Sequence, residues 1–277
     1  MLLDVRRGVR LGMPPDRAAV SVPTPPPGPG TAFAARRLHL HGRPVFELAL
    51  WCGTCPAVFT KASTPERADL GLAAERLAAG LDRVDRRVLR AWGRALPRSS
   101  YTVLLLEVAP RLVTPGAAED YFSHEQVATW GTEPLTGVPE HPGTPYYRTF
   151  DTPVPEDELD GHLHELVVPM VPPSWNDPAT TASYAGAPPT ATAVSYALLD
   201  VVVPATSGDA TDWHRHWVLQ HFLLDGHHKV EAAAAAGRPV RLLALLDESK
   251  SLAGPADLDV LLAARRRPPG HRRRPGA

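Results

Sequence analysis

The feature that most constrains the fold of this chain is a strand that runs into an Asp-Gly turn and then into an alanine-rich helix. Residues 217–224 are apolar and β-prone, Asp225 and Gly226 interrupt them, and residues 230–236 favour a helix. Residues 239–246 then form a second apolar run of strand length. Strands joined through a short helix predict an α/β or α+β fold with a mixed sheet.

The turn in this unit carries more polar side chains than a turn needs. Asp225, Gly226, His227, His228 and Lys229 lie where the helix begins, and the N–H groups and positive dipole end of a helix N-terminus favour an anion there. Glycine lets a backbone approach a ligand closely, and the lysine ammonium suits a phosphate. We therefore predict a phosphate or nucleotide site. The alternative is that Asp225 and His227 only hydrogen-bond the turn, with His228 in solvent.

The string Leu-Leu-Asp-Gly-His-His-Lys-Val-Glu-Ala-Ala, followed by Gly-Arg-Pro-Val-Arg-Leu-Leu, resembles the core of the ParB/sulfiredoxin-like superfamily over roughly residues 217–246. Asp225, Gly226 and His227 match the first three positions of its motif. Lys229 stands where arginine is usual, and Gly226 stands where sulfiredoxins have their cysteine. The resemblance implies a nucleotide ligand (ATP, ADP or CTP, with Mg²⁺) and a phosphotransferase or nucleotide hydrolase activity. It also implies that Asp225 to Lys229 bind the cofactor.

Catalysis at such a site needs a group that activates a hydroxyl. His227 is the candidate within the motif. The resemblance places a glutamate upstream in the serine kinases of the superfamily, and Glu119, Asp120 and Glu125 are candidates by composition.

Two cysteines, Cys52 and Cys55, form a separate candidate site within Trp-Cys-Gly-Thr-Cys-Pro. Their spacing is that of a thioredoxin-type redox pair, and a helix beginning at Cys52 would lower its thiol pKa. With His39 and His41 they also supply four ligands of the types that Zn²⁺ prefers. We thus keep three alternatives: a thiol oxidoreductase, a zinc or other non-enzymatic binding module, and two small residues in a tight turn.

Two further pairs, His162/His164 and His214/His216, have the spacing of same-face metal ligands on strands, and histidines on the solvent side of a strand explain them equally well. The net charge of −1 gives no global attraction to nucleic acid; only the basic C-terminal tail favours such contact, and weakly. No apolar run approaches the length of a membrane span, so we expect no membrane partner and a cytoplasmic protein. The sequence leaves the oligomeric state open.

The proline distribution indicates how the chain is divided. Residues 1–31 predict a disordered proline-rich leader, and residues 32–97 a hairpin, the Cys pair and a helical segment that Gly80 divides or bends. Residues 98–264 predict the α/β core with inserted loops, and residues 265–277 a disordered basic tail.

Overall fold

The computed structural model describes residues 1–23, 36–66, 70–155, 160–186, 190–204 and 214–266. Its strands are β1 (Leu2–Leu11), β2 (Val20–Ser21), β3 (Arg36–Leu40), β4 (Arg43–Leu48), β5 (Phe59–Lys61), β6 (Ser99–Val108), β7 (Arg111–Val113), β8 (Tyr146–Pro155), β9 (Asp160–Pro169), β10 (Thr192–Val202), β11 (His214–Asp225) and β12 (Val240–Asp247). Its helices are α1 (Ala74–Ala79), α2 (Arg86–Trp92), α3 (Glu125–Trp130), α4 (Pro178–Ala185), α5 (His227–Ala235) and α6 (Pro255–Arg266), with a 3₁₀ turn at Pro173–Trp175.

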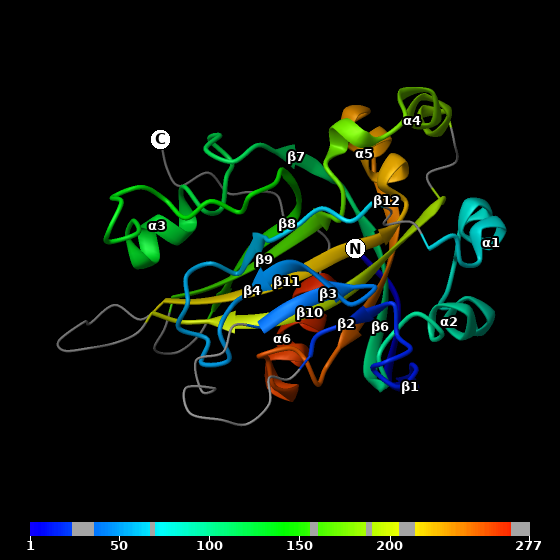
Figure 1. Cartoon of the computed structure of the whole chain (residues 1–277), viewed down its shortest axis with the longest axis horizontal. Coiled ribbons are helices and arrows are strands. Elements are labelled where there is room, and N and C mark those ends of the chain that lie inside the picture. The colour runs from blue at the N-terminus through cyan, green and yellow to red at the C-terminus, as the bar shows by residue number, and fades with distance from the viewer. Residues whose placement is uncertain (24–35, 67–69, 156–159, 187–189, 205–213, 267–277) are drawn as a thin grey trace.

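Eight strands form one large sheet in the order β1-β6-β12-β10-β11-β9-β8-β7 (Figure 1). β10 pairs with β12, and β11 with β9, in parallel, and the other neighbours are antiparallel. The sheet is therefore mixed, which confirms the predicted fold class. Because both faces are covered, its central strands read as nearly continuous apolar runs rather than alternating ones.

The four-stranded antiparallel sheet β2-β3-β4-β5 packs on one face of the large sheet (Figure 1). Phe46 of β4 packs against Phe222 of β11 with tilted rings at a centroid distance of 5.0 Å, and Phe59 of β5 meets Phe122 edge-on at 5.2 Å. A fully buried ion pair, Arg36 to Asp200 at 2.9 Å, also joins the two sheets. The N-terminal hairpin therefore shares one core with the C-terminal strands, and the expected boundary at residue 97 does not divide that core.

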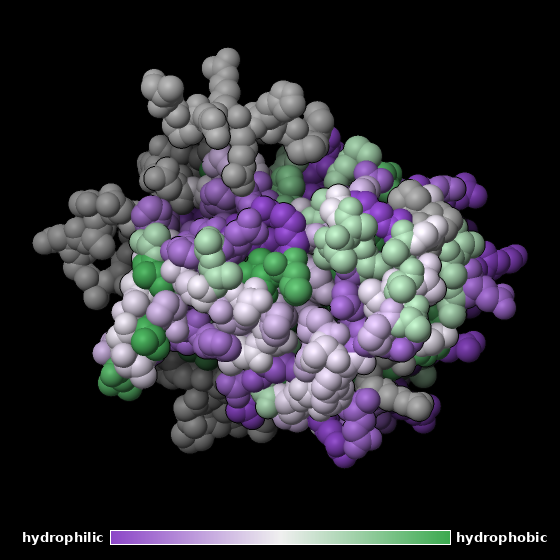
Figure 2. Space-filling model, turned by 90° about the horizontal axis from the view of Figure 1, so that it is seen from above, coloured by the Kyte–Doolittle hydropathy of each residue, from purple (hydrophilic) through white to green (hydrophobic). Residues whose placement is uncertain are grey.

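Helices α5 and α6 cover part of the opposite face, where Val230 and Leu261 join a second apolar cluster. The molecular face over α4 and α5 mixes hydrophilic and hydrophobic residues (Figure 2). Among the described helices, none has the length and apolar character needed to cross a membrane.

Two expectations about the chain ends are corrected. Leu2–Leu11 is not a disordered leader but an edge strand that pairs with β6, and two register shifts hide its period-two pattern in the sequence. At the other end, α6 runs to Arg266, and Arg265 is buried in an ion pair with Glu165 at 3.3 Å. Residues 12–23 of the predicted leader are also described and carry β2, whereas residues 24–31 and 267–277 lie outside the described residues.

The helical segment is also shorter than its apolar pattern predicts. Gly80, at φ 90°, does divide it, as expected. α2 begins after Asp85, whose carboxylate accepts hydrogen bonds from the N–H groups of Arg87 and Val88. Farther along the chain, α3 is a short helix with turns before it.

Candidate functional site

The junction of β11 with α5 contains the five residues predicted to bind a nucleotide. Gly226 caps the helix in the left-handed region at φ 91°. A Cβ at this position would lie 2.8 Å from the Cβ of Ala193, so only glycine fits both the conformation and the packing. This close approach packs α5 against β10, so the packing alone explains why position 226 is a glycine.

Lys229 is 6% exposed and turns back along the first turn of α5. Its Nζ donates to Asp225 Oδ2 at 3.1 Å and to the carbonyl oxygen of Thr192 at 3.0 Å. The ammonium predicted to hold a phosphate is thus paired within the protein, and it joins β10 to the end of β11.

The two histidines of the motif also contact the protein rather than solvent. The N–H of Met170, next to β9, donates to His227 Nε2 at 3.3 Å, and that of Asp177, before α4, donates to His228 Nε2 at 3.0 Å. Burial lowers the pKa of His227 to about 4, so its imidazole is neutral near pH 7. His228 is half-buried rather than free in solvent.

Lys61 of β5 is a basic neighbour of this junction, and no pattern in the sequence indicates it. Its Nζ donates to the carbonyl oxygen of Met170, the residue whose N–H binds His227, and lies 4.2 Å from the centroid of the Phe46 ring. Burial lowers its pKa to about 7. The polar side chains of the junction are therefore hydrogen-bonded within the protein. Nucleotide binding there stays a prediction.

The cysteine and histidine set is not brought together. His39 lies near the β3–β4 turn and His41 within it, whereas Cys52 and Cys55 follow the far end of β4. At about 3.3 Å per residue the strand separates the two pairs by roughly 20 Å. Among the described residues, no group of three or more His, Cys, Asp or Glu side chains is placed to hold a metal ion.

Both cysteines are free thiols, and they lie in a turn rather than at the expected helix start. The pKa of Cys52 is nevertheless lowered, because the Thr54 hydroxyl lies 3.0 Å from its Sγ. Burial raises the pKa of Cys55. The pair is therefore asymmetric, with the more acidic thiol on the outside.

The three predicted acidic residues, Glu119, Asp120 and Glu125, lie in and after one turn that leads into α3. Asp120 is buried, and both of its carboxylate oxygens accept hydrogen bonds. Its Oδ1 accepts from the Tyr146 hydroxyl at 2.8 Å, and its Oδ2 accepts from the Gly116 N–H at 2.8 Å and the Ser123 hydroxyl at 2.7 Å. Asp120 therefore fixes the turn that carries Glu119 and leads to Glu125, and these two line a cleft.

We call this cleft the acid–base cleft. It has a volume of about 370 Å³ and is lined by Arg111, Glu119, Glu125, Arg148, Asp151 and His162. A β-bulge at Thr149 in β8 puts Arg148 and Asp151 on the same face, where they pair at 3.4 Å.

Arg111 and Arg148 are cross-strand partners on β7 and β8. Their two guanidinium groups would repel each other if no carboxylates lay nearby. Arg148 Nη1 pairs with Glu125 Oε1 at 2.6 Å, and Arg111 Nη1 with Glu119 Oε1 at 3.4 Å. Burial acts to lower the pKa of Arg148, but Glu125 beside it outweighs this and holds the pKa above its ordinary value.

The two H-x-H pairs meet behind this cleft, because β9 and β11 are parallel with His162 opposite His216. The His162 and His164 rings stack at 4.5 Å, and His216 meets His164 edge-on at 5.0 Å. Burial lowers the pKa of all three, that of His216 to about 3. His214 lies at the start of β11, at the edge of the described residues.

Hydroxyl groups occupy both ring nitrogens of His216. The Thr129 hydroxyl donates to the carbonyl oxygen of Glu125, so at 3.2 Å it accepts from His216 Nε2–H. The Tyr121 hydroxyl then donates to His216 Nδ1 at 3.0 Å. His216 is therefore a neutral imidazole held by two hydrogen bonds, and its Nδ1 lone pair is already used by Tyr121 rather than free for a metal.

Several buried polar atoms around the acid–base cleft have no hydrogen-bond partner among the described residues. They are Glu125 Oε2, both amide atoms of Gln126, Trp130 Nε1, Arg148 Nε, and both ring nitrogens of His164. Of these residues, Glu125 and Arg148 line the cleft. Buried polar atoms are nearly always satisfied in proteins, so these two side chains mark the cleft as a place where a ligand or solvent completes the structure.

Comparison of the chain with protein-family models, curated proteins and solved structures found no match. The resemblance of residues 217–246 to the ParB/sulfiredoxin-like superfamily therefore stays a prediction.

Proposed function

We propose that the protein binds a small organic amine in the acid–base cleft, with Glu125 as the carboxylate that pairs with the ammonium group. The observation that carries the proposal is Glu125 Oε2, a buried carboxylate oxygen without a partner among the described residues at a cleft where three carboxylates face two guanidiniums. A bound ammonium would satisfy this oxygen and neutralise the residual charge of −1.

The arginines of the cleft do not favour an anionic ligand. Arg148 is clamped by Glu125 and Asp151, and Arg111 by Glu119 and more distantly, at 3.9 Å, by Asp151. An anion would have to displace a carboxylate from a guanidinium, whereas a cation adds a contact without breaking one. Arg148 Nε is a buried donor without a hydrogen-bond partner among the described residues.

His162 gives the cleft a means of proton transfer. Burial lowers its pKa below 6.5, and Asp151 and Glu125 offset part of that effect, so the ring is neutral near pH 7. A neutral imidazole can accept a proton from a bound ammonium or hydroxyl. Protonated His162 would repel an ammonium, so affinity for an amine should fall as the pH falls below the ordinary histidine range.

Phosphate or nucleotide binding at Asp225 to Lys229 has less support, because Lys229 is already paired with Asp225 and His227 is buried. An additional anion there would compete with an existing carboxylate. The acid–base cleft is thus the better supported ligand site.

The test uses three small molecules of similar size and different charge: ethanolamine, ethylene glycol and glycolate. Binding is followed by NMR of the histidine side chains in the full chain. We expect ethanolamine alone to shift the His162 signals, and Glu125→Gln to weaken it about 10-fold or more, as loss of a charged hydrogen bond does. Glu75→Gln on α1 is the matched control and should leave binding unchanged. Stronger binding of glycolate, or unchanged binding in Glu125→Gln, would refute the proposal.

A further inference from the structure

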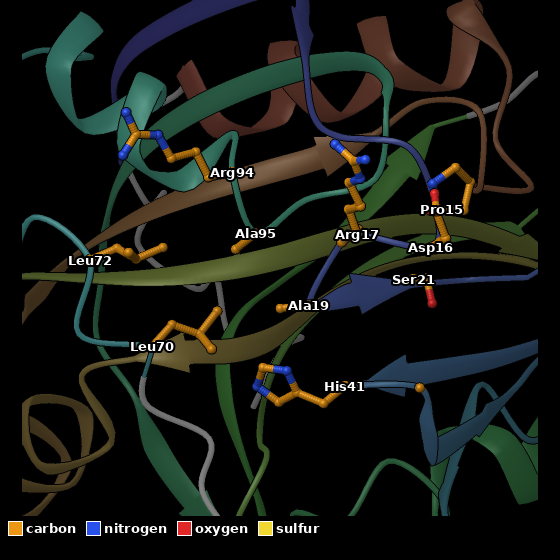
Figure 3. Close-up of a pocket in the computed structure, with 12 residues that line it drawn as sticks. Pro15, Asp16, Arg17, Ala19, Ser21, His41, Leu70, Leu72, Arg94 and Ala95 are labelled. Atoms are coloured by element: carbon orange, nitrogen blue, oxygen red, sulfur yellow. The ribbon is translucent and has the colours of Figure 1, made fainter.

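A second and larger pocket lies away from the acid–base cleft, with a volume of about 640 Å³. Four segments line it: the β1–β2 connection, the β3–β4 turn, the stretch before α1 and the end of α2 (Figure 3). We call it the arginine pocket, after Arg17 and Arg94. None of the sites predicted from the sequence includes these two residues.

Backbone hydrogen bonds fix the walls of the arginine pocket. The N–H of Val20 donates to the carbonyl oxygen of Ala95 at 2.9 Å, which joins the β1–β2 connection to the end of α2. The N–H of His41 donates to the carbonyl oxygen of Ala19 at 2.6 Å, which adds the β3–β4 turn. The pocket is therefore preformed, and a ligand would not have to order its walls.

The charged groups of the arginine pocket are available to a ligand. Arg17 and Arg94 are both exposed, and neither side chain forms an ion pair or hydrogen bond within the described part of the chain. Asp16 is the acidic residue among the lining side chains, so the lining combines two guanidinium groups with one carboxylate. In Figure 3, Arg17 and Arg94 lie along one side of the pocket and His41 lies across from them.

An apolar part of the pocket lies beside these charges. Leu70 and Leu72, which precede α1, are half-buried and line one end, and Ala19 and Ala95 lie between them and the arginines (Figure 3). Guanidinium groups match phosphate oxygens bidentately, and leucine side chains favour an apolar or aromatic surface. The arginine side and the leucine side of the pocket together favour a ligand with one anionic and one apolar end.

We infer that the arginine pocket binds a phosphomonoester whose remaining part is apolar or aromatic. Arg17 and Arg94 hold the phosphate, and Leu70 and Leu72 cover the apolar group. This ligand is opposite in charge to the amine of the acid–base cleft, and the two pockets share no lining residue, so they are separate sites.

Isothermal titration of the full chain with adenosine 5′-monophosphate, adenosine and inorganic phosphate tests this inference. We expect the monophosphate to bind at least 10-fold more tightly than either fragment, and its affinity to fall with rising salt. Arg17→Gln and Arg94→Gln should each weaken it about 10-fold. Arg266→Gln, an exposed arginine on α6 across the large sheet, should leave it unchanged.

The inference is overturned if adenosine binds as well as its monophosphate, if both arginine variants keep the parent affinity, or if no heat is measured at millimolar ligand. Glu125→Gln separates the two sites, since it should weaken ethanolamine binding about 10-fold or more and leave the monophosphate titration as in the parent. Both arginines are exposed, so their variants should fold like the parent, which circular dichroism can check.

Discussion

The buried ion pair at the β11–α5 junction predicts that Lys229 acts on stability rather than on ligand binding. Lys229 Nζ contacts Asp225 Oδ2 at 3.1 Å and the carbonyl oxygen of Thr192 at 3.0 Å, with side-chain exposures of 6% for Lys229 and 13% for Asp225. Lys229→Met keeps most of the side-chain volume and removes the charge. It leaves a carboxylate almost fully buried without its cation.

Breaking a buried ion pair by removing one partner lowers the free energy of unfolding by about 3–5 kcal/mol. Asp225 keeps a small contact with solvent, so we expect the lower end, about 3 kcal/mol. For a chain of this size each kcal/mol lowers Tm by roughly 2–3 °C, which gives a fall of roughly 6–9 °C. The double variant Asp225→Asn/Lys229→Met removes both charges and should recover most of the loss.

Urea unfolding followed by circular dichroism measures these differences in parent, single and double variants. A thermal-shift panel of ATP, ADP, CTP and GTP, with and without magnesium, is run on the same proteins. We expect Lys229→Met to be destabilised and to respond to each nucleotide as the parent does. If instead its stability equals the parent's while a nucleotide response present in the parent disappears, the ion pair is not structural and the phosphate site predicted from the sequence is right.

Three further predictions follow from other residues. Burial lowers the pKa of His216 to about 3 and those of His221 and His227 to about 4. Below about pH 6.5 these histidines therefore take up protons in the unfolded chain but stay neutral in the folded chain. The free energy of unfolding should fall as the pH falls from about 6.5 to 4, by up to about 3 kcal/mol per histidine. Urea unfolding between pH 7 and 4.5 checks this, and a free energy of unfolding that does not change with pH contradicts it. Gly226→Ala should lower stability by about 2 kcal/mol or more, because it combines a left-handed φ of 91° with a 2.8 Å contact to Ala193; an unchanged urea midpoint would show that the junction relaxes. Cys52 should react with a disulfide reagent faster than Cys55, since its pKa is lowered and it is exposed; equal rates in the two single-cysteine variants would show that the Thr54 contact has no effect.

The sequence predicted β11, β12 and α5 well, because each is an uninterrupted apolar or alanine-rich run that turn residues separate from the next. It failed for β1, where two register shifts break the alternation and arginines make the strand resemble a polar leader. It also overestimated the helix around Leu77 and Val88, since apolar residues at helical spacing do not show where a left-handed Gly80 or a capping Asp85 ends the element.

The order of strands in the large sheet was beyond the reach of the sequence, and it determines which side chains meet. The pairs His162/His164 and His214/His216 are visible in the sequence, but only the parallel pairing of β9 with β11 places them side by side. Glu125 and Arg148, 23 residues apart, meet because α3 folds over β8. Such contacts depend on tertiary packing, for which a single sequence gives no pattern.

The contrast between the junction and the cleft follows from where polar residues lie along the chain. Asp225 ends β11 and Lys229 lies four residues later in the first turn of α5, and the turn at Gly226 brings the two side chains together as an ion pair. A dense polar motif can therefore satisfy itself locally. Glu125 and His164 come from separate elements, and each keeps buried polar atoms without a partner among the described residues. Unsatisfied groups assembled from distant segments are the better indication of a ligand, because no local contact accounts for the free energy lost in burying them.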